Sequence, residues 1–444
     1  MMESNQKQLV LGAYLTYGTG HHPAAWRHPD VNPQAAQDIG HYLNMARIAE
    51  KGLLDLIFLS DTPSVFQDDQ RGYGSRVVVF EPMTLLSALA IVTEHIGLVA
   101  TASTTYKHPF NIAREFASLD HISRGRAGWN LVTSSKSHAA KNFGFAQHPE
   151  HDERYHQAAE SWDIVTGLWD SWDDDALPRD KQSGIFYDPS KCHELNFQGQ
   201  YFSVKGPLNI SHPPQGHPII VQAGSSEPGK ELAARTAELV FTAQPDMNLA
   251  KAFYSDLKSR LSQYERHYNN ILIMPGLCFF IGADEESAKK KFNDLQALIH
   301  PEFGLSMLSD LLGDIDLSGY DINQALPDLP VSNGNQSRRA IIEKMARSES
   351  LTIKQLYEKI IIARGHLIFI GSYQQVAAQM VQWLQEKACD GFNLMPPYMP
   401  GCLEEFVTHV VPELQKLGVF KTDYKSGTLR EKLNIPKPPS KFHV

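Results

Sequence analysis

The segment IGLVATASTTYKHPFNIAREFASLDHISRGRAGWNLVTS, residues 96–134, carries the pattern on which the fold prediction rests. Two short apolar runs, at 96–103 and 126–132, are predicted strands, and residues 109–122 between them are a predicted helix. Two strands joined through a helix favour a parallel pair, because parallel strands need a crossover connection. The segment therefore predicts one strand–helix–strand unit of an α/β protein.

The same alternation of strand and helix continues along the rest of the chain. Eight apolar runs are predicted strands, each followed by a predicted helix, and the runs are 9–15, 54–61, 96–103, 126–132, 218–224, 238–243, 271–282 and 391–396. Eight units favour closure into a (β/α)8 TIM barrel, whereas five or six would favour an open doubly wound sheet. We therefore expect an α/β fold of the TIM-barrel type.

Two segments interrupt this alternation, at about 136–217 and 300–365. We expect both to be insertions over the C-terminal face of the barrel, where loops commonly shape a pocket. The run 366–372 is a possible extra strand, and the polar, proline-rich tail at 420–444 is expected to lie over a neighbouring surface. Residues 1–444 are expected to form a single domain.

Composition excludes several classes of function. The chain has 444 residues and a net charge of −9, with no basic patch interleaved with aromatics, so nucleic acid is not an expected partner. The chain contains no run of about 18 apolar residues, so a membrane span is not expected. The N-terminus lacks the long apolar core of a signal peptide. No CxxC or zinc-ligand spacing is present, so we expect no metal and a reduced cytoplasmic protein. The four cysteines are Cys192, Cys278, Cys389 and Cys402.

Polar residues collect where the predicted strands end, which is where barrels of this kind hold their chemistry. No lysine base, carboxylate pair or metal-ligand cluster accompanies them, so the set suits a large polar cofactor better than acid–base catalysis by side chains. Taken singly, Asp61 could cap a turn, Thr101 could be an ordinary strand residue, and loop histidines usually lie at the surface; only the clustering indicates a site. The residues are His21, His22, Trp26 and His28 after the first strand, then Ser60, Asp61, Thr101, Ser103, Thr104, Thr105, Asn130, Thr133, Ser134, Ser135 and 222–226.

The stretch QAGSSEPGKE, residues 222–231, has the G-x4-G-K spacing of a phosphate-binding P-loop. Glu231 stands where a P-loop needs Ser or Thr for magnesium, and Pro228 lacks the N–H that the phosphate cradle requires. We interpret the stretch instead as a strand–turn–helix whose N–H groups and hydroxyls bind one phosphate.

The stretch HPEHDERYHQ, residues 148–157, places His151 and Tyr155 four residues apart, so on a helix they share one face. A zinc site would need HExxH or an HxH pair, and neither is present. The pair is predicted to lie beside a flavin or a phosphate.

These motifs together resemble a known family. GRAGWNLVTS (125–134), with FLSD (58–61), PEHDERY (149–155) and QAGSS (222–226), is similar to the nitrilotriacetate monooxygenase / dibenzothiophene sulfone monooxygenase family. Its members are two-component FMN-dependent monooxygenases of the bacterial-luciferase-like superfamily. The resemblance extends from WRHPD near the start to TLREKL near the end, so it covers nearly the whole chain.

The resemblance implies that reduced FMN binds at the C-terminal face of the barrel. By motif position it places Asn130 beside the isoalloxazine and His21, loosely, near the substrate; these two are the predicted catalytic residues. Arg124 replaces a glycine that many members have, and a substrate-side histidine of some relatives has no match in 300–365. The predicted cofactor-binding residues are Asp61, Thr101, Asn130, His151, Tyr155, Ser225 and Ser226.

The implied reaction uses reduced FMN and O2 to oxygenate a small organic substrate at a carbon next to sulfur or nitrogen, with C–S or C–N cleavage. A separate NAD(P)H:FMN reductase is the expected partner, because no GxGxxG unit for NAD is visible. An F420-dependent oxidoreductase of the same barrel fold and a non-catalytic flavin-binding protein are the alternatives. A homodimer or homotetramer is expected.

Overall fold

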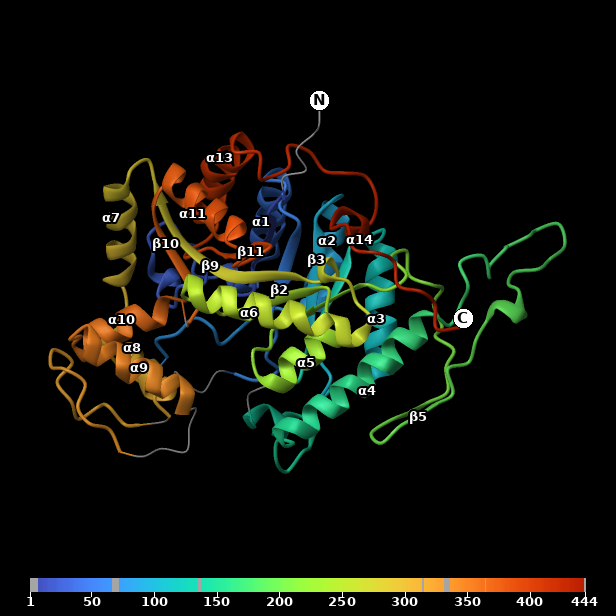
Figure 1. Cartoon of the computed structure of the whole chain (residues 1–444), viewed down its shortest axis with the longest axis horizontal. Coiled ribbons are helices and arrows are strands. Elements are labelled where there is room, and N and C mark those ends of the chain that lie inside the picture. Colours follow the sequence, from blue (N-terminus) through green and yellow to red (C-terminus); the bar gives the residue numbers. More distant parts are fainter. Residues whose placement is uncertain are drawn as a thin grey trace.

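Eight parallel strands close into a barrel (Figure 1). The computed structural model describes residues 7–65, 72–134, 137–313, 315–330, 336–363 and 365–442, so Ser135 lies outside the described residues. Each strand lies within its predicted run, and the (β/α)8 prediction is confirmed. In barrel order the strands are β1 (Val10–Tyr14), β2 (Leu56–Leu59), β3 (Gly97–Ser103), β4 (Ala127–Val132), β7 (Ile219–Gln222), β8 (Leu239–Thr242), β9 (Leu272–Gly282) and β11 (Gly391–Met395), which pairs with β1.

The possible extra strand is confirmed as β10 (Leu367–Ser372). It pairs in parallel with residues 277–282 of β9, whereas β8 pairs with residues 272–275. β9 is long enough to hold both partners, and β10 therefore lies outside the ring of eight.

Helices cover the outside of the barrel (Figure 1). Two of them, α2 (Pro82–Val92) and α3 (Pro109–Ile122), begin at a proline, whose missing N–H is not needed in a first turn. The preceding residues, Glu81 and His108, accept hydrogen bonds from first-turn N–H groups. The other covering helices are α1 (Ile39–Lys51), α4 (His151–Trp169), α5 (Glu227–Thr236), α6 (Met247–Arg260), α7 (Glu285–Gln296), α11 (Tyr373–Gln385), and α12 (Gly401–Glu405) joined to α13 (Val411–Lys416) through a π-helical turn.

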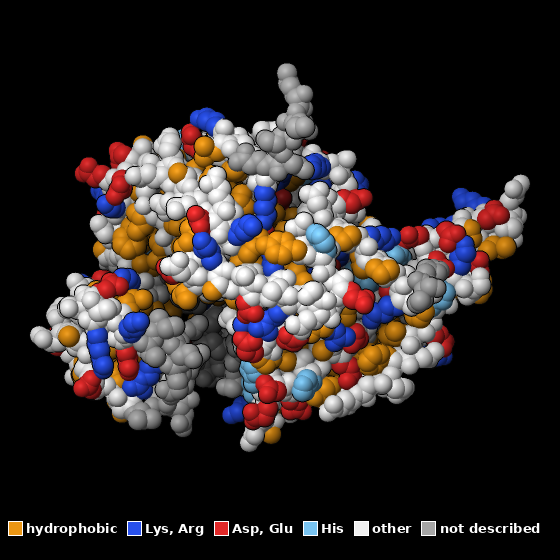
Figure 2. All heavy atoms as spheres, viewed as in Figure 1, with side chains coloured by type: hydrophobic (Ala, Val, Ile, Leu, Met, Phe, Trp, Pro, Cys, Tyr) orange, Lys and Arg blue, Asp and Glu red, His pale blue; other side chains and the backbone are white. Residues whose placement is uncertain are grey.

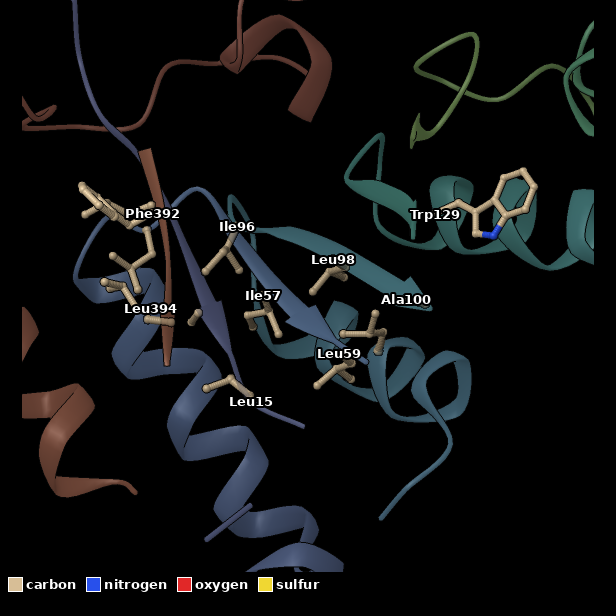
Figure 3. Packing of buried hydrophobic residues seen from close by; sticks show 14 of the residues in the cluster. Leu15, Ile57, Leu59, Ile96, Leu98, Ala100, Trp129, Phe392 and Leu394 are labelled. Atoms are coloured by element: carbon tan, nitrogen blue, oxygen red, sulfur yellow. The ribbon is translucent and has the colours of Figure 1, made fainter. Parts of the chain in front are cut away.

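Side chains alternate between the two faces of each strand. Outward residues such as Ile57, Leu98 and Trp129 belong to the largest apolar cluster, shared by strands and helices (Figure 3). Inward residues such as Tyr14 and Phe58 form a separate cluster within the barrel. The hydrophobic core is therefore divided by the sheet, and polar groups near the C-terminal strand ends sit on top of the inner cluster.

The C-terminal tail closes the opposite end of the barrel. Leu429 in α14 (Leu429–Lys432), Leu433 and Ile435 are buried in the inner cluster, and the Leu429 N–H donates to the carbonyl of Gly125, just before β4. Arg430 is 2% exposed and donates to Glu238 Oε1 at 3.0 Å. The tail was expected on a neighbouring surface, but burial of its apolar residues draws it into the core instead.

The second insertion, 300–365, lies at the C-terminal face, where Ala24 of the β1–α1 connection shares its apolar cluster. It contains α8 (Pro301–Leu311), α9 (Gln336–Ser348) and α10 (Ile353–Ala363). The first insertion is divided. Residues 137–150 lie at this face, but α4 is the barrel helix that returns the chain from β4 to β7.

Residues 170–217 run to the opposite end of the barrel, which differs from the expected cover over the C-terminal face. There the side chain of Asp170 accepts from the N–H of Lys441 at 3.0 Å, and Asp174 pairs with Lys437. This segment includes the short hairpin of β5 (Phe197–Gln198) and β6 (Ser203–Val204), and residues 173–193, called the arm below, which project from the body (Figure 1).

Candidate functional site

A cavity of about 360 Å³ opens at the C-terminal ends of β2, β4 and β7. Its size falls within the range of about 300–1,000 Å³ that is usual for ligand pockets. Tyr155 closes one side from α4, and Ala139 comes from the 3-10 helix at 137–143. The lining residues are Asp61, Thr62, Pro63, Leu131, Val132, Thr133, Ser134, Ala139, Tyr155, Gln222, Ala223, Gly224 and Leu232.

A second cavity, of about 430 Å³, adjoins the first. Both are lined by Asp61, Thr62 and Pro63, so this turn after β2 is their common wall. The second cavity lies at the C-terminal ends of β1 and β2. Its other lining residues are Thr16, Tyr17, Gln37, Ser60, Ser64, Val65, Arg76, Val77, Val78, Val79 and Asn142. The arrangement offers two adjacent compartments. Of the predicted cofactor-binding residues, Asp61 and Tyr155 line the first cavity, whereas Thr101, Asn130, His151, Ser225 and Ser226 line neither.

Asp61 is the acidic residue among those lining both cavities. Burial raises the pKa of its carboxyl to about 6, and the negative charge of Glu81 adds to the effect. A carboxyl with this pKa gains and loses a proton close to neutral pH, which an ordinary surface aspartate does not.

Asn130 and Thr101 face each other across the β3–β4 ladder, on the inner side of the barrel. The Thr101 hydroxyl donates to the carbonyl of Leu59 at 2.8 Å, so it can only accept from Asn130, whose Nδ2 lies 2.7 Å away. This fixes the orientation of the amide. Asn130 is 2% exposed, and its Oδ1 has no hydrogen-bond partner in the described part of the chain.

An unpaired buried carbonyl oxygen costs about 1–3 kcal/mol. A ligand that presents an N–H to Asn130 Oδ1 would remove this cost, and a flavin ring carries such groups. The residues present therefore fit the flavin that the sequence motifs imply.

The start of α5 provides the predicted phosphate site. Ser226 is the N-cap: its hydroxyl accepts from the Gly229 N–H at 3.3 Å, and it lies 3.4 Å from the Tyr155 hydroxyl. A Cβ at Gly229 would lie 3.0 Å from that same hydroxyl, so the close approach of α4 and α5 requires glycine there. Ser225 is exposed beside Ser226. The N-terminus of a helix attracts anions, which suits a phosphate.

His151 joins this group through Tyr155. Their ring centroids are 4.9 Å apart, and the imidazole Nδ1 lies 2.9 Å from Asp152 Oδ1. The His151 side chain is 48% exposed, so it remains accessible to a ligand. The structure thus places Ser226 and His151 next to Tyr155, which lines the cavity.

His21 and His22 are buried, whereas an isolated loop histidine usually lies at the surface. Backbone hydrogen bonds from their N–H groups to Pro396 and Pro397 hold the loop inside the barrel mouth. The His21 ring lies 5.9 Å from that of Tyr14 and does not line either cavity. Burial lowers the pKa of His22 to about 4, so His22 is neutral at pH 7.

Several residues near the second cavity were not predicted from sequence. The Tyr14 hydroxyl lies 2.7 Å from Ser60 Oγ, which donates to Thr16 Oγ1 at 3.1 Å, and burial raises the pKa of Tyr14. Arg76 lines the cavity with its guanidinium 4.4 Å from the Tyr17 ring. The period-2 alternation of β1 could have identified Tyr14 as an inward residue; nothing local identifies Arg76.

His366 was also missed. Its ring stacks on Phe241 at 5.0 Å and lies 6.3 Å from that of His21, at the top of the inner aromatic cluster. It follows 300–365, the range in which no matching histidine was found.

Within the described ranges, no three His, Cys, Asp or Glu side chains gather closely enough to hold a metal ion. No helix in these ranges has the length and apolar character needed to cross a membrane.

Comparison with known proteins places these features in context. A family model described as luciferase-like monooxygenase matches residues 17–390. The chain is 49% identical to N-acetyl-S-(2-succino)cysteine monooxygenase of Bacillus subtilis, over 99% of this chain and 100% of that protein. It is also 49% identical to nitrilotriacetate monooxygenase component A of Aminobacter aminovorans, over 97% of each.

Among solved structures, a riboflavin lyase containing modified FMN and riboflavin has a TM-score of 0.84 and 31% identity, covering 96% of each chain. An F420-dependent secondary alcohol dehydrogenase has a TM-score of 0.58 at 13% identity, which shows a shared fold alone. The alternative of an F420-dependent oxidoreductase is therefore not favoured.

Proposed function

Because the chain belongs to the luciferase-like monooxygenase family, we propose that it is a two-component enzyme whose flavin binds in the cavity at the ends of β2, β4 and β7. The electron donor is reduced FMN made by a separate NAD(P)H:FMN reductase. When bound, reduced FMN supplies the electrons that activate O2, which side chains cannot supply. The observation that carries the proposal is the fixed, unpaired acceptor Asn130 Oδ1 on the inner face of the barrel.

The cofactor-binding residues divide into two groups. Ser225, Ser226, Tyr155 and His151 hold the phosphate at the start of α5, where hydroxyls and N–H groups act without a buried counter-charge. The other group, Asp61, Thr101 and Asn130, lies near the strand ends and would contact the ring.

The chain's own contribution to catalysis is orientation, protection from water and proton balance. Asn130 would accept a hydrogen bond from an N–H of the bound ring, and Thr101 prevents its amide from rotating. Asp61 stands between the two cavities and holds or releases a proton near pH 6. Neutral donors and acceptors suit this task because burying them costs less than burying charges.

The second cavity is the proposed substrate compartment. Arg76 lines it, and the Arg76 guanidinium donates a hydrogen bond to the carbonyl of His21, which lies behind Arg76. Its valine wall and polar floor suit a small substrate that has both apolar and polar parts. The two relatives at 49% identity are named for a sulfur compound and for a nitrogen compound. Oxygenation at a carbon next to sulfur or nitrogen, with C–S or C–N cleavage, is the proposed reaction.

The test is turnover with a flavin reductase, NADH, FMN and O2 on a panel of thioethers, sulfones and tertiary amines, with products identified by mass spectrometry. One atom of 18O2 is expected in the oxygenated product. Omission of the reductase should abolish turnover. Flavin binding without an oxygen-dependent product from any compound would favour a non-catalytic flavin-binding protein instead.

A further inference from the structure

Thr16 and Ser60 lie next to each other just after the ends of β1 and β2, and both line the second cavity. The two strands are paired in parallel up to Tyr14 and Phe58, two residues earlier in each strand. The Ser60 N–H donates to Thr16 Oγ1 at 2.7 Å, and the Ser60 hydroxyl donates to the same oxygen at 3.1 Å. Both lone pairs of the Thr16 hydroxyl are therefore occupied.

The hydrogen bonds of this group run in one direction. Because the Ser60 hydroxyl donates to Thr16, its oxygen can only accept from the Tyr14 hydroxyl, which lies 2.7 Å away. Tyr14 is buried, and burial raises the pKa of its phenol, so Tyr14 stays protonated and acts as the first donor. The Tyr42 hydroxyl donates to the carbonyl of Thr16 at 3.2 Å, which holds the backbone at this position.

The Thr16 hydroxyl is the last donor of this series. Within the described ranges it donates no hydrogen bond, although its oxygen accepts two. Thr16 is 6% exposed, and the cavity that it lines has a volume of about 430 Å³. A buried donor is costly unless it finds an acceptor. The hydroxyl is therefore available to donate to a ligand in this cavity.

Arg76 adds a positive charge to the same cavity. It is the one basic residue among the described residues that line the two cavities, and it lines only the second. On the face shown in Figure 2, acidic and basic side chains are interspersed, and the chain as a whole carries −9. The net charge does not attract anions, so an anionic ligand has to be bound by local groups. A hydroxyl donor together with a guanidinium suits a carboxylate.

Asp61 determines which way such a ligand lies. Its carboxyl is on the wall common to both cavities, and burial raises its pKa to about 6, so most of it is ionised at pH 7. Because like charges repel, the carboxylate of a ligand lies away from this wall, on the side of Thr16 and Arg76. The rest of the ligand then faces the first cavity, where the flavin is proposed to bind.

We propose that Thr16 is a substrate-binding residue whose hydroxyl donates to a carboxylate of the substrate, and that Ser60 and Tyr14 are positioning residues that hold this hydroxyl. The substrate class is a thioether, sulfone or amine that carries a carboxylate close to the bond that is cleaved. This inference rests on the proposed function, because it takes the second cavity as the substrate compartment.

Equilibrium binding tests this role of Thr16 without turnover. Thiodiacetate, sulfonyldiacetate and N-methyliminodiacetate are titrated into the flavin-free protein by calorimetry, each beside its dimethyl ester. The wild type should bind the acids at least about tenfold more tightly than the esters, as a hydrogen bond to a charged group provides. Thr16→Val should lower this ratio of acid to ester affinity by about tenfold. Thr16→Ser keeps the hydroxyl and should retain the ratio of the wild type.

The ratio is insensitive to a loss of stability, because acid and ester are measured on the same variant. Tyr14→Phe should lower the ratio by less than Thr16→Val does, since Thr16 then keeps both hydrogen bonds from Ser60. Thr166→Val is the control and should have the ratio of the wild type. Thr166 is 1% exposed, its hydroxyl donates to the carbonyl of Trp162 at 2.8 Å, and it lines neither cavity.

Acids that fail to bind the wild type, acids and esters that bind it equally, or a ratio that Thr16→Val leaves unchanged would overturn the role of Thr16. A ratio unchanged in Tyr14→Phe would overturn the positioning role of Tyr14. Turnover with reductase, NADH, FMN and O2 separates this inference from the proposed function. A binding preference for acids without an oxygenated product from any compound would overturn the proposed function alone. Turnover of acids and esters with equal kcat/KM would overturn this inference alone.

Discussion

The Asn130–Thr101 pair allows stability and activity to be separated. If Asn130 is present for the cofactor, its replacement by Leu, which has the same branching at Cγ, should not destabilise the flavin-free protein. Replacement of Thr101 by Val removes the same hydrogen bond from the other side and should destabilise it. The two variants therefore break one contact with different expected effects on the free energy of unfolding.

The magnitudes follow from the partners of each atom. Asn130→Leu loses the hydrogen bond to Thr101, about 0.5–1.5 kcal/mol, and removes the unpaired Oδ1, a gain of about 1–3 kcal/mol. The net change therefore lies between about 0.5 kcal/mol of destabilisation and about 2.5 kcal/mol of stabilisation. Thr101→Val loses the bonds to Asn130 and Leu59 and leaves Asn130 Nδ2 unpaired, which costs about 1–3 kcal/mol.

Urea unfolding of the flavin-free proteins, followed by tryptophan fluorescence, measures both values. Product formed per reduced FMN oxidised should fall in Asn130→Leu, with more peroxide released. Destabilisation of Asn130→Leu by about 2 kcal/mol or more, or unchanged coupling of flavin oxidation to product, would refute a cofactor role for Asn130.

Three further outcomes follow from other parts of the structure. The raised pKa of Asp61 means that the folded state binds the proton more tightly than the unfolded chain does. The free energy of unfolding of the flavin-free protein should therefore fall by roughly 2 kcal/mol as the pH rises from about 4 to about 6. Asp61→Asn should show a flatter pH profile in thermal unfolding, and a profile identical to that of the wild type would contradict the assignment. Ser226→Asp keeps an N-cap acceptor for Gly229 but places a negative charge at the phosphate site, so FMN affinity in calorimetric titration should fall by about tenfold or more while the melting temperature holds. Arg430→Met removes a buried guanidinium from Glu238 and should cost about 3–5 kcal/mol in urea unfolding. Lys425→Met, at an exposed position of the same tail, should change stability by less than about 0.5 kcal/mol, and equal effects would show that the tail does not close the barrel.

Much of the candidate site could be predicted because its residues lie close to the ends of strands. Asp61 and Ser226 follow strands, and Thr101 and Asn130 each lie two residues before the end of one. Parallel strands bring their C-terminal ends to one face of a barrel, so sequence position alone indicated a common site. The direction in which the Asn130 amide points was not predictable, since it depends on the second hydrogen bond of Thr101 to Leu59.

The sequence by itself determined the succession of strands and helices, because apolar periodicity and helix caps are properties of neighbouring residues. Only the tertiary structure decided which distant segments meet. The burial of His22 against Gln296, the entry of Leu429 and Leu433 into the barrel, and the projection of the arm all depend on contacts between residues far apart in the chain. Such contacts leave no local pattern, because packing selects them by shape and by the pairing of buried polar groups after the barrel has closed.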